Sequence, residues 1–199
     1  MSTTIRRRGR PKGESDSRER IVAAAEHEFG EHGYDGATIR AIAGRAGVDS
    51  ALVHHYFGAK ADLFAEVIGI PLRPDVEVPT ILQGPREEVG ERVVRYVLQS
   101  FEHPDVRRRG VTMIRVAVGS KVMGQPLVGF LSRELLGRIA SGMDTPDAML
   151  RANLVASQMA GLLLTRYVVR LQPIADAPIE ELVARIGPTV QRYLFEERP

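Results

Sequence analysis

Small and polar residues between positions 49 and 55 have types and spacing suited to contacts with nucleic acid. They follow a glycine–valine pair, and two imidazoles come one helical turn after the first polar residues. On one face of a short helix, hydroxyl and imidazole groups can hydrogen-bond to base edges and phosphates in a DNA major groove. The outward residues of this predicted DNA-contacting helix are Asp49, Ser50, Ala51, His54 and His55.

The residues before this helix have the pattern of a helix-turn-helix, whose second helix lies in the major groove. Gly47 permits the positive φ that the tight turn requires. Ala43 is small enough for the two helices to touch, and Asp49 is expected to act mainly as the N-cap of the second helix. The alternative is a helical hairpin inside an ordinary bundle, which does not account for the adjacent His54 and His55.

A basic arm at positions 1–13 could also contact DNA. Arg8, Gly9 and Arg10 resemble an AT-hook, in which glycine lets the backbone enter a narrow minor groove between two arginines. The same residues are equally compatible with a solvated basic tail. If they contact the groove, deletion of residues 1–13 is expected to weaken DNA binding and to flatten its salt dependence.

The histidines lead to one further hypothesis and exclude another. Imidazole side chains gain a proton as the pH falls through about 6.5, so contacts of His54 and His55 with DNA would tighten at lower pH. A metal site is not expected. His27 and His32 face different directions, and no acidic residue completes a set of metal ligands with His54 and His55. We predict no cofactor.

Charge is distributed unevenly along the chain, although the total of 27 basic and 25 acidic residues gives a net charge of only +2. Positions 1–13 have five bases and no acid, whereas 14–70 have five bases and ten acids. Net charge alone therefore does not predict DNA binding.

Composition limits the class of protein. The chain has 199 residues, of which 44% are hydrophobic and 26% charged, as in an average globular domain. The absence of cysteine excludes disulfides and thiolate catalysis. No apolar run is long enough to span a membrane and no secretory signal is recognisable, so we expect a cytoplasmic protein. No nucleophile–base pair or phosphate-binding loop is present, and we do not expect an enzyme.

Helical periodicity positions all of these residues, and no segment alternates as a strand does. Asp16 and Glu19 have capping-box spacing and predict the start of the first helix, which Gly33 is expected to end. Pro71 to Pro85 is predicted to be a boundary without an element of its own. Further helices are expected at about 38–46, 49–56, 59–70, 85–102, 104–118, 125–141, 146–171 and 178–196.

The predicted fold is all-α. An N-terminal three-helix helix-turn-helix DNA-binding domain, with its linking helix, would occupy residues 14–70 behind the flexible arm. A larger C-terminal helical bundle for regulation and dimerisation would occupy residues 71–199.

Residues 18–68 resemble the N-terminal domain of the tetracycline-repressor (TetR) family. The C-terminal two-thirds is similar to the regulatory domain of that family in length and helix layout. The resemblance rests on Thr38-Ile39-Arg40-Ala41-Ile42-Ala43, on Gly47-Val48 and on the run from His54 through Tyr56, Phe57, Gly58 and Lys60 to Asp62-Leu63-Phe64.

The resemblance implies a role for each matching residue. Ser50 and Ala51 would meet bases, and His54, where the family more often has tyrosine, would face base or phosphate. Leu52, Asp49 and Ser50 depart from the family pattern, which leaves the operator sequence and the affinity open. The residues implied to contact phosphate are Thr38, Tyr56 and Lys60.

The resemblance further implies that the last two long helices form a homodimer and that the other helices hold an effector pocket. From 153 to 171 the sequence is nearly apolar, with small residues at Ala156, Ala160 and Gly161 that permit close packing. The alternative is that both helices lie at the centre of a monomeric bundle.

Methionines, aromatic residues and isolated polar residues in the bundle are candidates for the pocket lining, although such residues are often plain core. Their character favours a hydrophobic or amphipathic small molecule. The predicted ligand-binding residues are Phe101, Met113, Met123, Phe130, Gln158, Met159 and Tyr167.

The expected function is that of a ligand-responsive repressor. A homodimer would bind a pseudo-palindromic double-stranded operator with half-sites about 34 Å apart, or a multiple of this, and a small effector would release it. The alternatives are an activator or broad DNA binder of the same fold, and a ligand-binding helical scaffold without sequence-specific DNA binding.

Overall fold

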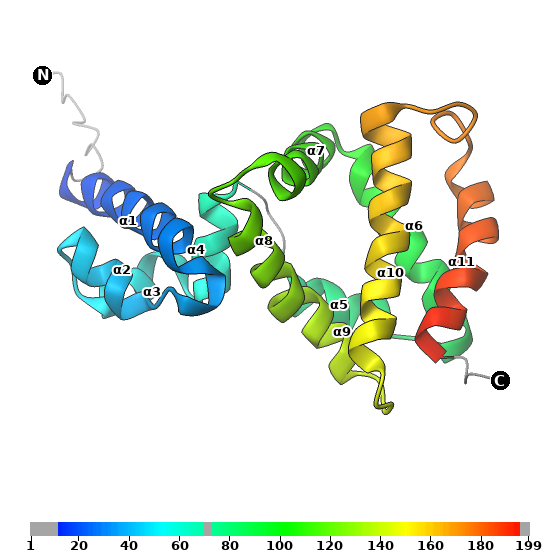
Figure 1. Cartoon of the computed structure of the whole chain (residues 1–199), viewed down its shortest axis with the longest axis horizontal. Coiled ribbons are helices and arrows are strands. Elements are labelled where there is room, and N and C mark those ends of the chain that lie inside the picture. Colours follow the sequence, from blue (N-terminus) through cyan, green and yellow to red (C-terminus); the bar gives the residue numbers. More distant parts are fainter. Residues whose placement is uncertain (1–11, 70–72, 196–199) are drawn as a thin grey trace, which may run out of the picture.

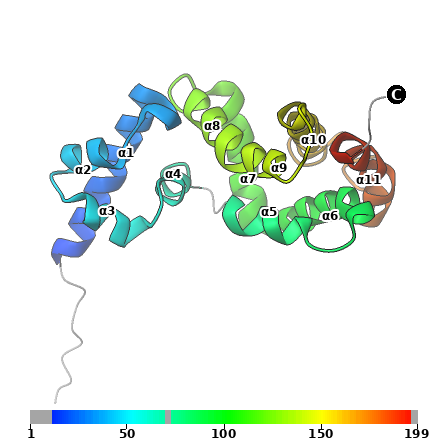
Figure 2. The same ribbon diagram turned by 90° about the horizontal axis from the view of Figure 1, so that it is seen from below.

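The computed structural model describes residues 12–69, here called the head, and residues 73–195, here called the body. The predicted AT-hook-like residues Arg8, Gly9 and Arg10 lie outside the described residues. All elements within the two described ranges are helical, which confirms the all-α fold. Figure 1 shows the small head joined to the larger body, and Figure 2 shows the same arrangement from below.

The helices of the head follow the predicted order. Thr38 and Asp49 cap the second and third helices at their N-termini, and Gly47 and Gly58 end the same helices. The head contains α1 (Lys12–Gly36), α2 (Ile39–Ala46), α3 (Ser50–Phe57) and α4 (Lys60–Val67).

The first helix differs from the prediction at its N-terminus. It begins at Lys12 rather than Asp16. The Asp16 carboxylate pairs instead with Arg20 one turn later, with Oδ2 and Nε 3.4 Å apart, as side chains inside a helix do. Gly33 has a non-helical φ of 71° and ends the continuous helix as predicted, and a further helical turn follows as far as Gly36.

Aromatic rings fill the core of the head and extend into the body. Phe29, Tyr34 and Phe64 are at most 2% exposed. Phe130 of the body completes this cluster, with its ring centroid 4.9 Å from that of Phe64 and 5.3 Å from that of Tyr34. Such aromatic contacts add stability beyond the area they bury. The head and the body therefore share a core.

The described body contains seven α-helices, two of which continue directly into π-helical turns. In Figure 1, α8 lies beside the head, whereas α6, α10 and α11 lie at the far end of the body. The elements are α5 (Pro74–Leu82), η1 (Arg86–Glu88), α6 (Val89–Glu102), α7 (Pro104–Gly119), α8 (Gly124–Phe130), η2 (Leu131–Leu136), α9 (Gly137–Ser141), α10 (Ala148–Leu163), η3 (Leu164–Val169) and α11 (Ile179–Phe195).

The prediction of a boundary without an element between Pro71 and Pro85 is wrong, because α5 lies there. Pro74 occupies the first helical position, where no amide N–H is needed. Pro79 removes one hydrogen bond inside the helix, but Val78 beside it is buried and anchors the turn. A proline-rich segment can therefore be a boundary between domains and still contain a short packed helix.

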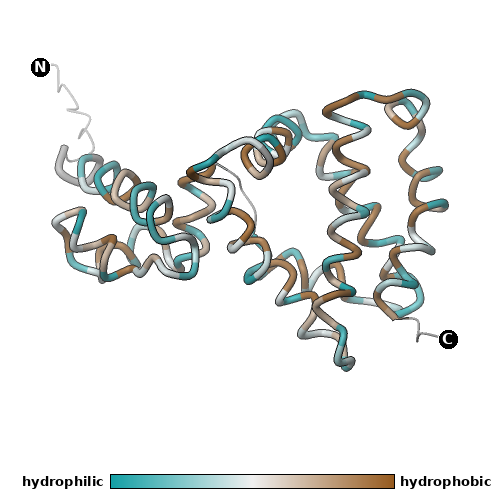
Figure 3. The backbone as a smooth tube through the Cα atoms, in the orientation of Figure 1, coloured by the Kyte–Doolittle hydropathy of each residue, from teal (hydrophilic) through white to brown (hydrophobic). Residues whose placement is uncertain are grey.

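Helices α6 and α11 pack closely at a pair of glycines. A Cβ atom on Gly90 would overlap the carbonyl oxygen of Gly187, and the Gly90 N–H donates to Gln191 Oε1 at 2.8 Å. Helix α10 packs against both α6 and α11, and Figure 3 shows hydrophobic residues recurring along it. The three helices share a hydrophobic core, whose buried side chains include Val94, Leu98, Val155, Leu162, Val183 and Val190.

Candidate nucleic-acid interface

Two N-caps and one left-handed residue set the geometry of α2 and α3. Thr38 Oγ1 accepts a hydrogen bond from the Ala41 amide at 3.1 Å. Gly47 has a φ of 65° and a ψ of 39°, which is the left-handed conformation expected for the turn. Asp49 Oδ1 accepts from the Ala51 amide at 2.7 Å, which confirms that Asp49 is the N-cap of α3.

Helix α3 has an apolar face within the head and a polar face outside it. Val53 is fully buried and Phe57 is 9% exposed, so these two side chains anchor the helix. The opposite face brings together four of the residues predicted to contact DNA. The outward residues, of which the first is half-buried and the others are exposed, are Ser50, Ala51, His54 and His55.

The residues implied to hold phosphate from the end of α3 and the start of α4 have partners inside the head. Tyr56 is half-buried, and its ring centroid lies 5.5 Å from that of His55. Lys60 Nζ donates to the carbonyl oxygens of Tyr34 at 2.8 Å and Ala37 at 3.1 Å. Burial lowers the pKa of Lys60. The ammonium nitrogen also lies 4.5 Å from the centroid of the Tyr34 ring, so Lys60 is held by cation–π attraction as well as by hydrogen bonds.

A buried carboxylate fixes α2 against α1. Glu28 is 5% exposed, and its Oε1 accepts from Arg45 Nε at 2.7 Å. His32 Nε2 lies 3.7 Å from the other carboxylate oxygen. Arg20 Nη1 donates to the Ala46 carbonyl at 3.0 Å, at the end of α2. These basic side chains of the head therefore hold its helices together.

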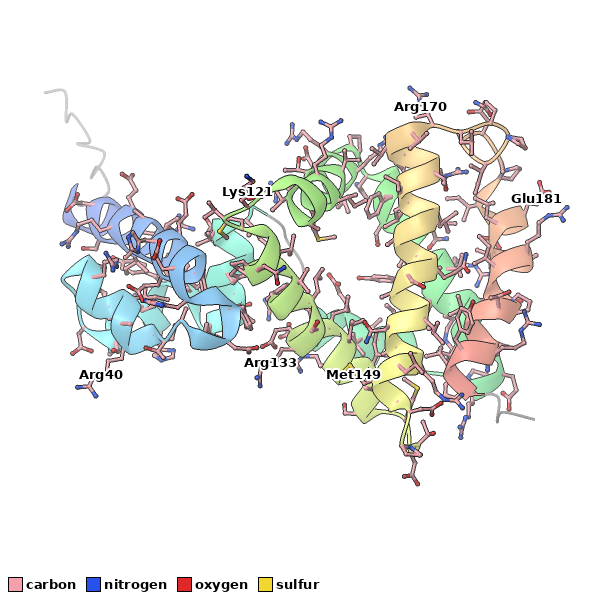
Figure 4. All side chains as sticks on the ribbon, viewed as in Figure 1. Arg40, Lys121, Arg133, Met149, Arg170 and Glu181 are labelled. Carbon is pink, nitrogen blue, oxygen red and sulfur yellow. The ribbon has the colours of Figure 1, made fainter. Side chains whose placement is uncertain are left out.

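Arg40 is a candidate contact residue that the sequence patterns missed. It is exposed in the first turn of α2, two positions after Thr38. Its side chain forms neither a hydrogen bond nor an ion pair with the residues that the structure describes, and Figure 4 shows it pointing away from the head. A guanidinium in this position can contact a phosphate. The signal in the sequence was a basic residue on the side of the helix opposite Ile42.

Polar contacts join the end of α1 to the body. The Tyr34 hydroxyl donates to Glu134 Oε1 at 2.8 Å, and Arg133 Nε donates to Asp35 Oδ1 at 2.5 Å. Figure 4 shows Arg133 at this junction, on the π-helical turn η2. Burial, followed by the hydrogen bond to Glu134, raises the pKa of Tyr34 far above its ordinary value. The phenol therefore remains a hydrogen-bond donor.

The residues predicted to bind a ligand fall into two groups. Members of one group pack against the core of the head, namely Met113, Met123 and Phe130. The other group belongs to α6, α10 and η3 in the body, namely Phe101, Gln158, Met159 and Tyr167. The rings of Phe101 and Tyr167 contact each other with centroids 5.2 Å apart. The structure does not gather the two groups around one described hollow.

A hollow of about 140 Å³ lies between the end of α11 and the loop before α10. Its lining is polar on one side, where Arg151 is paired with Asp147 at 2.7 Å. None of the predicted ligand-binding residues lines it. The lining residues are Arg86, Met143, Asp144, Thr145, Arg151, Leu194 and Phe195.

The outward side of α10, continued by the first residue of η3, carries exposed leucines, with the exposed polar residues Asn153 and Ser157 beside them. Leu150, Leu154 and Leu164 are 48%, 37% and 40% exposed, and their spacing places them on one side of the helix. Met149, labelled in Figure 4, extends the same surface at the start of α10 and is 46% exposed. We call these four residues the α10 face. Several large apolar side chains exposed on one side of a helix are typical of an interaction surface.

No described helix is both long enough and apolar enough to cross a membrane. Within the described part of the chain, no three histidine, aspartate or glutamate side chains form a group that could hold a metal ion.

Both parts of the chain match family models. Residues 21–67 match the model described as bacterial regulatory proteins, tetR family. Residues 87–194 match the model described as tetracyclin repressor-like, C-terminal domain. The first match covers the helix-turn-helix, and the second covers most of the body.

Individual relatives agree with these matches. The HTH-type transcriptional regulator BetI of Agrobacterium fabrum is 31% identical over 174 residues, which cover 83% of this chain and 84% of that protein. The HTH-type transcriptional repressor AcnR of Corynebacterium glutamicum is 40% identical over 50 residues, which cover 25% of this chain and 27% of AcnR.

A solved structure agrees in fold as well as in sequence. A TetR-family regulator from Streptomyces coelicolor A3 has a TM-score of 0.51 and 36% identity, over 94% of this chain and 98% of that chain. The matching families and relatives are transcriptional regulators, which confirms the prediction that this chain is not an enzyme. The chain belongs to the TetR family of transcriptional regulators.

Proposed function

We propose that this protein is a ligand-responsive repressor that binds a pseudo-palindromic operator as a homodimer. The observation that carries the proposal is the outward face of α3, which is polar and exposed while Val53 and Phe57 anchor the helix. AcnR, which is similar to the head of this chain, is named a repressor, and this supports repression here. The protein would act in the cytoplasm, where its operator lies.

The proposed DNA contacts divide by chemistry. Ser50, Ala51, His54 and His55 would face base edges, because α3 presents them together. Asp49 would hold the N-terminus of α3 at the groove through its cap. The proposed phosphate contacts are Thr38, Arg40, Tyr56 and Lys60. The arm residues Arg8, Gly9 and Arg10 would enter the adjacent minor groove.

We propose that the α10 face and α11 form the dimer interface. Burying the exposed leucines of α10 against a second copy would remove apolar surface from water. On the neighbouring helix α11, Ala184 and Pro188 are exposed and small enough for a close approach. A two-fold axis here would place two α3 helices on one side of the DNA, at half-sites about 34 Å apart or a multiple of this.

The effector would act by shifting α8 and η2. Phe130 lies in the shared core and Glu134 receives the Tyr34 hydrogen bond, so movement of this segment moves the head. A small hydrophobic or amphipathic molecule would favour a conformer whose heads no longer match the half-site spacing. Its proposed contacts are the seven residues Phe101, Met113, Met123, Phe130, Gln158, Met159 and Tyr167.

The same proposal divides the chain by role. Residues 14–70 form the DNA-binding domain, behind an arm at 1–13 whose last residues belong to α1. Residues 71–199 form the ligand-binding and dimerisation domain.

Selection of bound duplexes from a random DNA pool, with the mass of the complex measured by sedimentation, tests this proposal. We expect a palindromic consensus occupied by two chains, with binding that weakens steeply as salt rises. Failure to enrich any duplex would contradict operator binding. An asymmetric consensus occupied by one chain would contradict the homodimer. A screen of amphipathic compounds for release of the selected duplex then tests the effector.

A further inference from the structure

One ring nitrogen of His54 forms a hydrogen bond within the head. Its Nδ1 lies 2.8 Å from the carbonyl oxygen of Gly58. A carbonyl oxygen only accepts hydrogen bonds, so Nδ1 carries the hydrogen and donates it. Gly58, with a φ of 72°, in turn donates its N–H to the His54 carbonyl at 2.9 Å. The side-chain bond holds the imidazole against the end of α3 and sets its tautomer, and the backbone bond fixes the position of Gly58, which supplies the acceptor.

The set tautomer decides what the other nitrogen can bind. In a neutral imidazole one nitrogen donates and the other accepts. With Nδ1 donating, Nε2 of neutral His54 presents a lone pair, and the side chain is exposed on the outward face of α3. Phosphate oxygens, guanine O6 and purine N7 are themselves acceptors, so they cannot bond to it. In the major groove the exocyclic amino groups of adenine N6 and cytosine N4 are the donors.

We propose that neutral His54 accepts a hydrogen bond from an exocyclic amino group, adenine N6 or cytosine N4, and so specifies one base pair in each half-site. This inference rests on the proposed function and assigns a chemistry to one of its contact residues. The neighbouring His55 differs, because its ring packs against Tyr56 and has no hydrogen bond among the described residues. The hydroxyl of Ser50 can both donate and accept, so it discriminates less.

The test uses the operator selected by the full chain and removes single amino groups from it. Each adenine of a half-site is replaced in turn by purine, which lacks the N6 amine, and each cytosine by pyrimidin-2-one, which lacks the N4 amine. The affinities of the wild-type chain and of His54→Ala are compared at about pH 8, above the range in which imidazoles titrate. The weaker base pairing of a substituted duplex affects both proteins equally, so the comparison isolates the contact.

We expect one position at which loss of the amine weakens wild-type binding about three- to tenfold, the size of one hydrogen bond. His54→Ala should lose less than about twofold there, because the contact is already absent. His55→Ala, the matched control on the same face, should keep the full dependence on that amine. His54→Gln, whose amide oxygen can accept, should recover part of it.

Once an operator has been selected, three results would overturn the inference. If wild-type binding depends through His54 on a purine N7, measured with 7-deaza bases, then Nε2 donates. If His54→Ala weakens all duplexes equally and flattens the salt dependence, then His54 contacts phosphate. If an operator is enriched but its amine dependence is the same in wild type and His54→Ala, this inference fails while the proposed function stands. A chain that enriches no operator contradicts both. His54 is exposed, so His54→Ala should melt at the wild-type temperature, which confirms that the variant is folded.

Discussion

Helices α3 and α10 each present one face to the outside, and they differ in what the residues of that face specify. The face of α3 carries groups that donate or accept hydrogen bonds, and the helix is held by the Asp49 cap and by Gly58. The face of α10 carries leucines, whose contacts are non-directional. A polar face therefore indicates the chemistry of its ligand, whereas an apolar face indicates only that another surface covers it.

The largest expected effect comes from breaking the α10 face. Leu154→Glu would place an unpaired carboxylate in the proposed dimer interface, which costs several kcal/mol. We expect monomers by sedimentation and a loss of operator affinity of at least about 100-fold. Val76→Glu is the matched control, because this valine is 54% exposed on α5, away from α10. A dimeric Leu154→Glu chain with normal affinity would show that α10 is not the interface.

The second prediction contrasts a crowded helix crossing in the body with an open position in the head. Gly90→Ala would push α6 from α11 and lower the free energy of unfolding by about 1–3 kcal/mol. Gly44→Ala on α2, where nothing lies within 4 Å of the added carbon, should raise it by about 0.5–1 kcal/mol. Denaturant unfolding measures both, and changes of the same sign would refute the contrast.

The third prediction concerns the phosphate contact that Arg40 on α2 is proposed to make. Arg40→Ala should remove one phosphate contact and reduce the slope of log K against log salt by about one, with little change in sequence preference. Titrations of the selected operator at several salt concentrations measure this slope. Arg108→Ala on α7 is the control, since its exposed side chain pairs with Asp105 within the body. Equal slopes for wild type and Arg40→Ala would exclude Arg40 from the interface.

The smallest expected effect concerns the junction between head and body. Tyr34→Phe keeps the buried ring but removes the donor to Glu134, so the free energy of unfolding should fall by about 1 kcal/mol. Glu134→Gln retains an acceptor for the phenol and should cost less. Calorimetric melting compares the two variants. If Tyr34→Phe melts like the wild type, the hydrogen bond does not stabilise the junction.

The helix-turn-helix could be predicted from the sequence because its determinants are local. The Asp49 cap bonds to an amide two residues away, and the turn depends on the φ of Gly47. The partners of Lys60 could not be predicted, because the carbonyl groups of Tyr34 and Ala37 are more than 20 residues away in the chain. Sequence reasoning placed Lys60 at the phosphates and missed its bonds inside the head.

The body was less predictable for a physical reason. Phe130 and Met159 have the same helical spacing whether they line a pocket or fill a core, and in the structure they lie in different clusters. Helix α5 was missed because Pro79, inside the helix, opposes helix formation, while tertiary packing of Val78 favours it. Periodicity located the other helices but not the contacts between them.

The central claim is that two α3 helices of one dimer bind two half-sites on the same side of the DNA. The most direct test measures the affinity of the wild-type chain for the selected operator, for the same operator with five base pairs inserted at its centre, and for one with a scrambled half-site. Five base pairs rotate the second half-site by about half a turn. We predict that the insertion lowers the affinity to that of the scrambled duplex. Unchanged affinity after the insertion would contradict the claim.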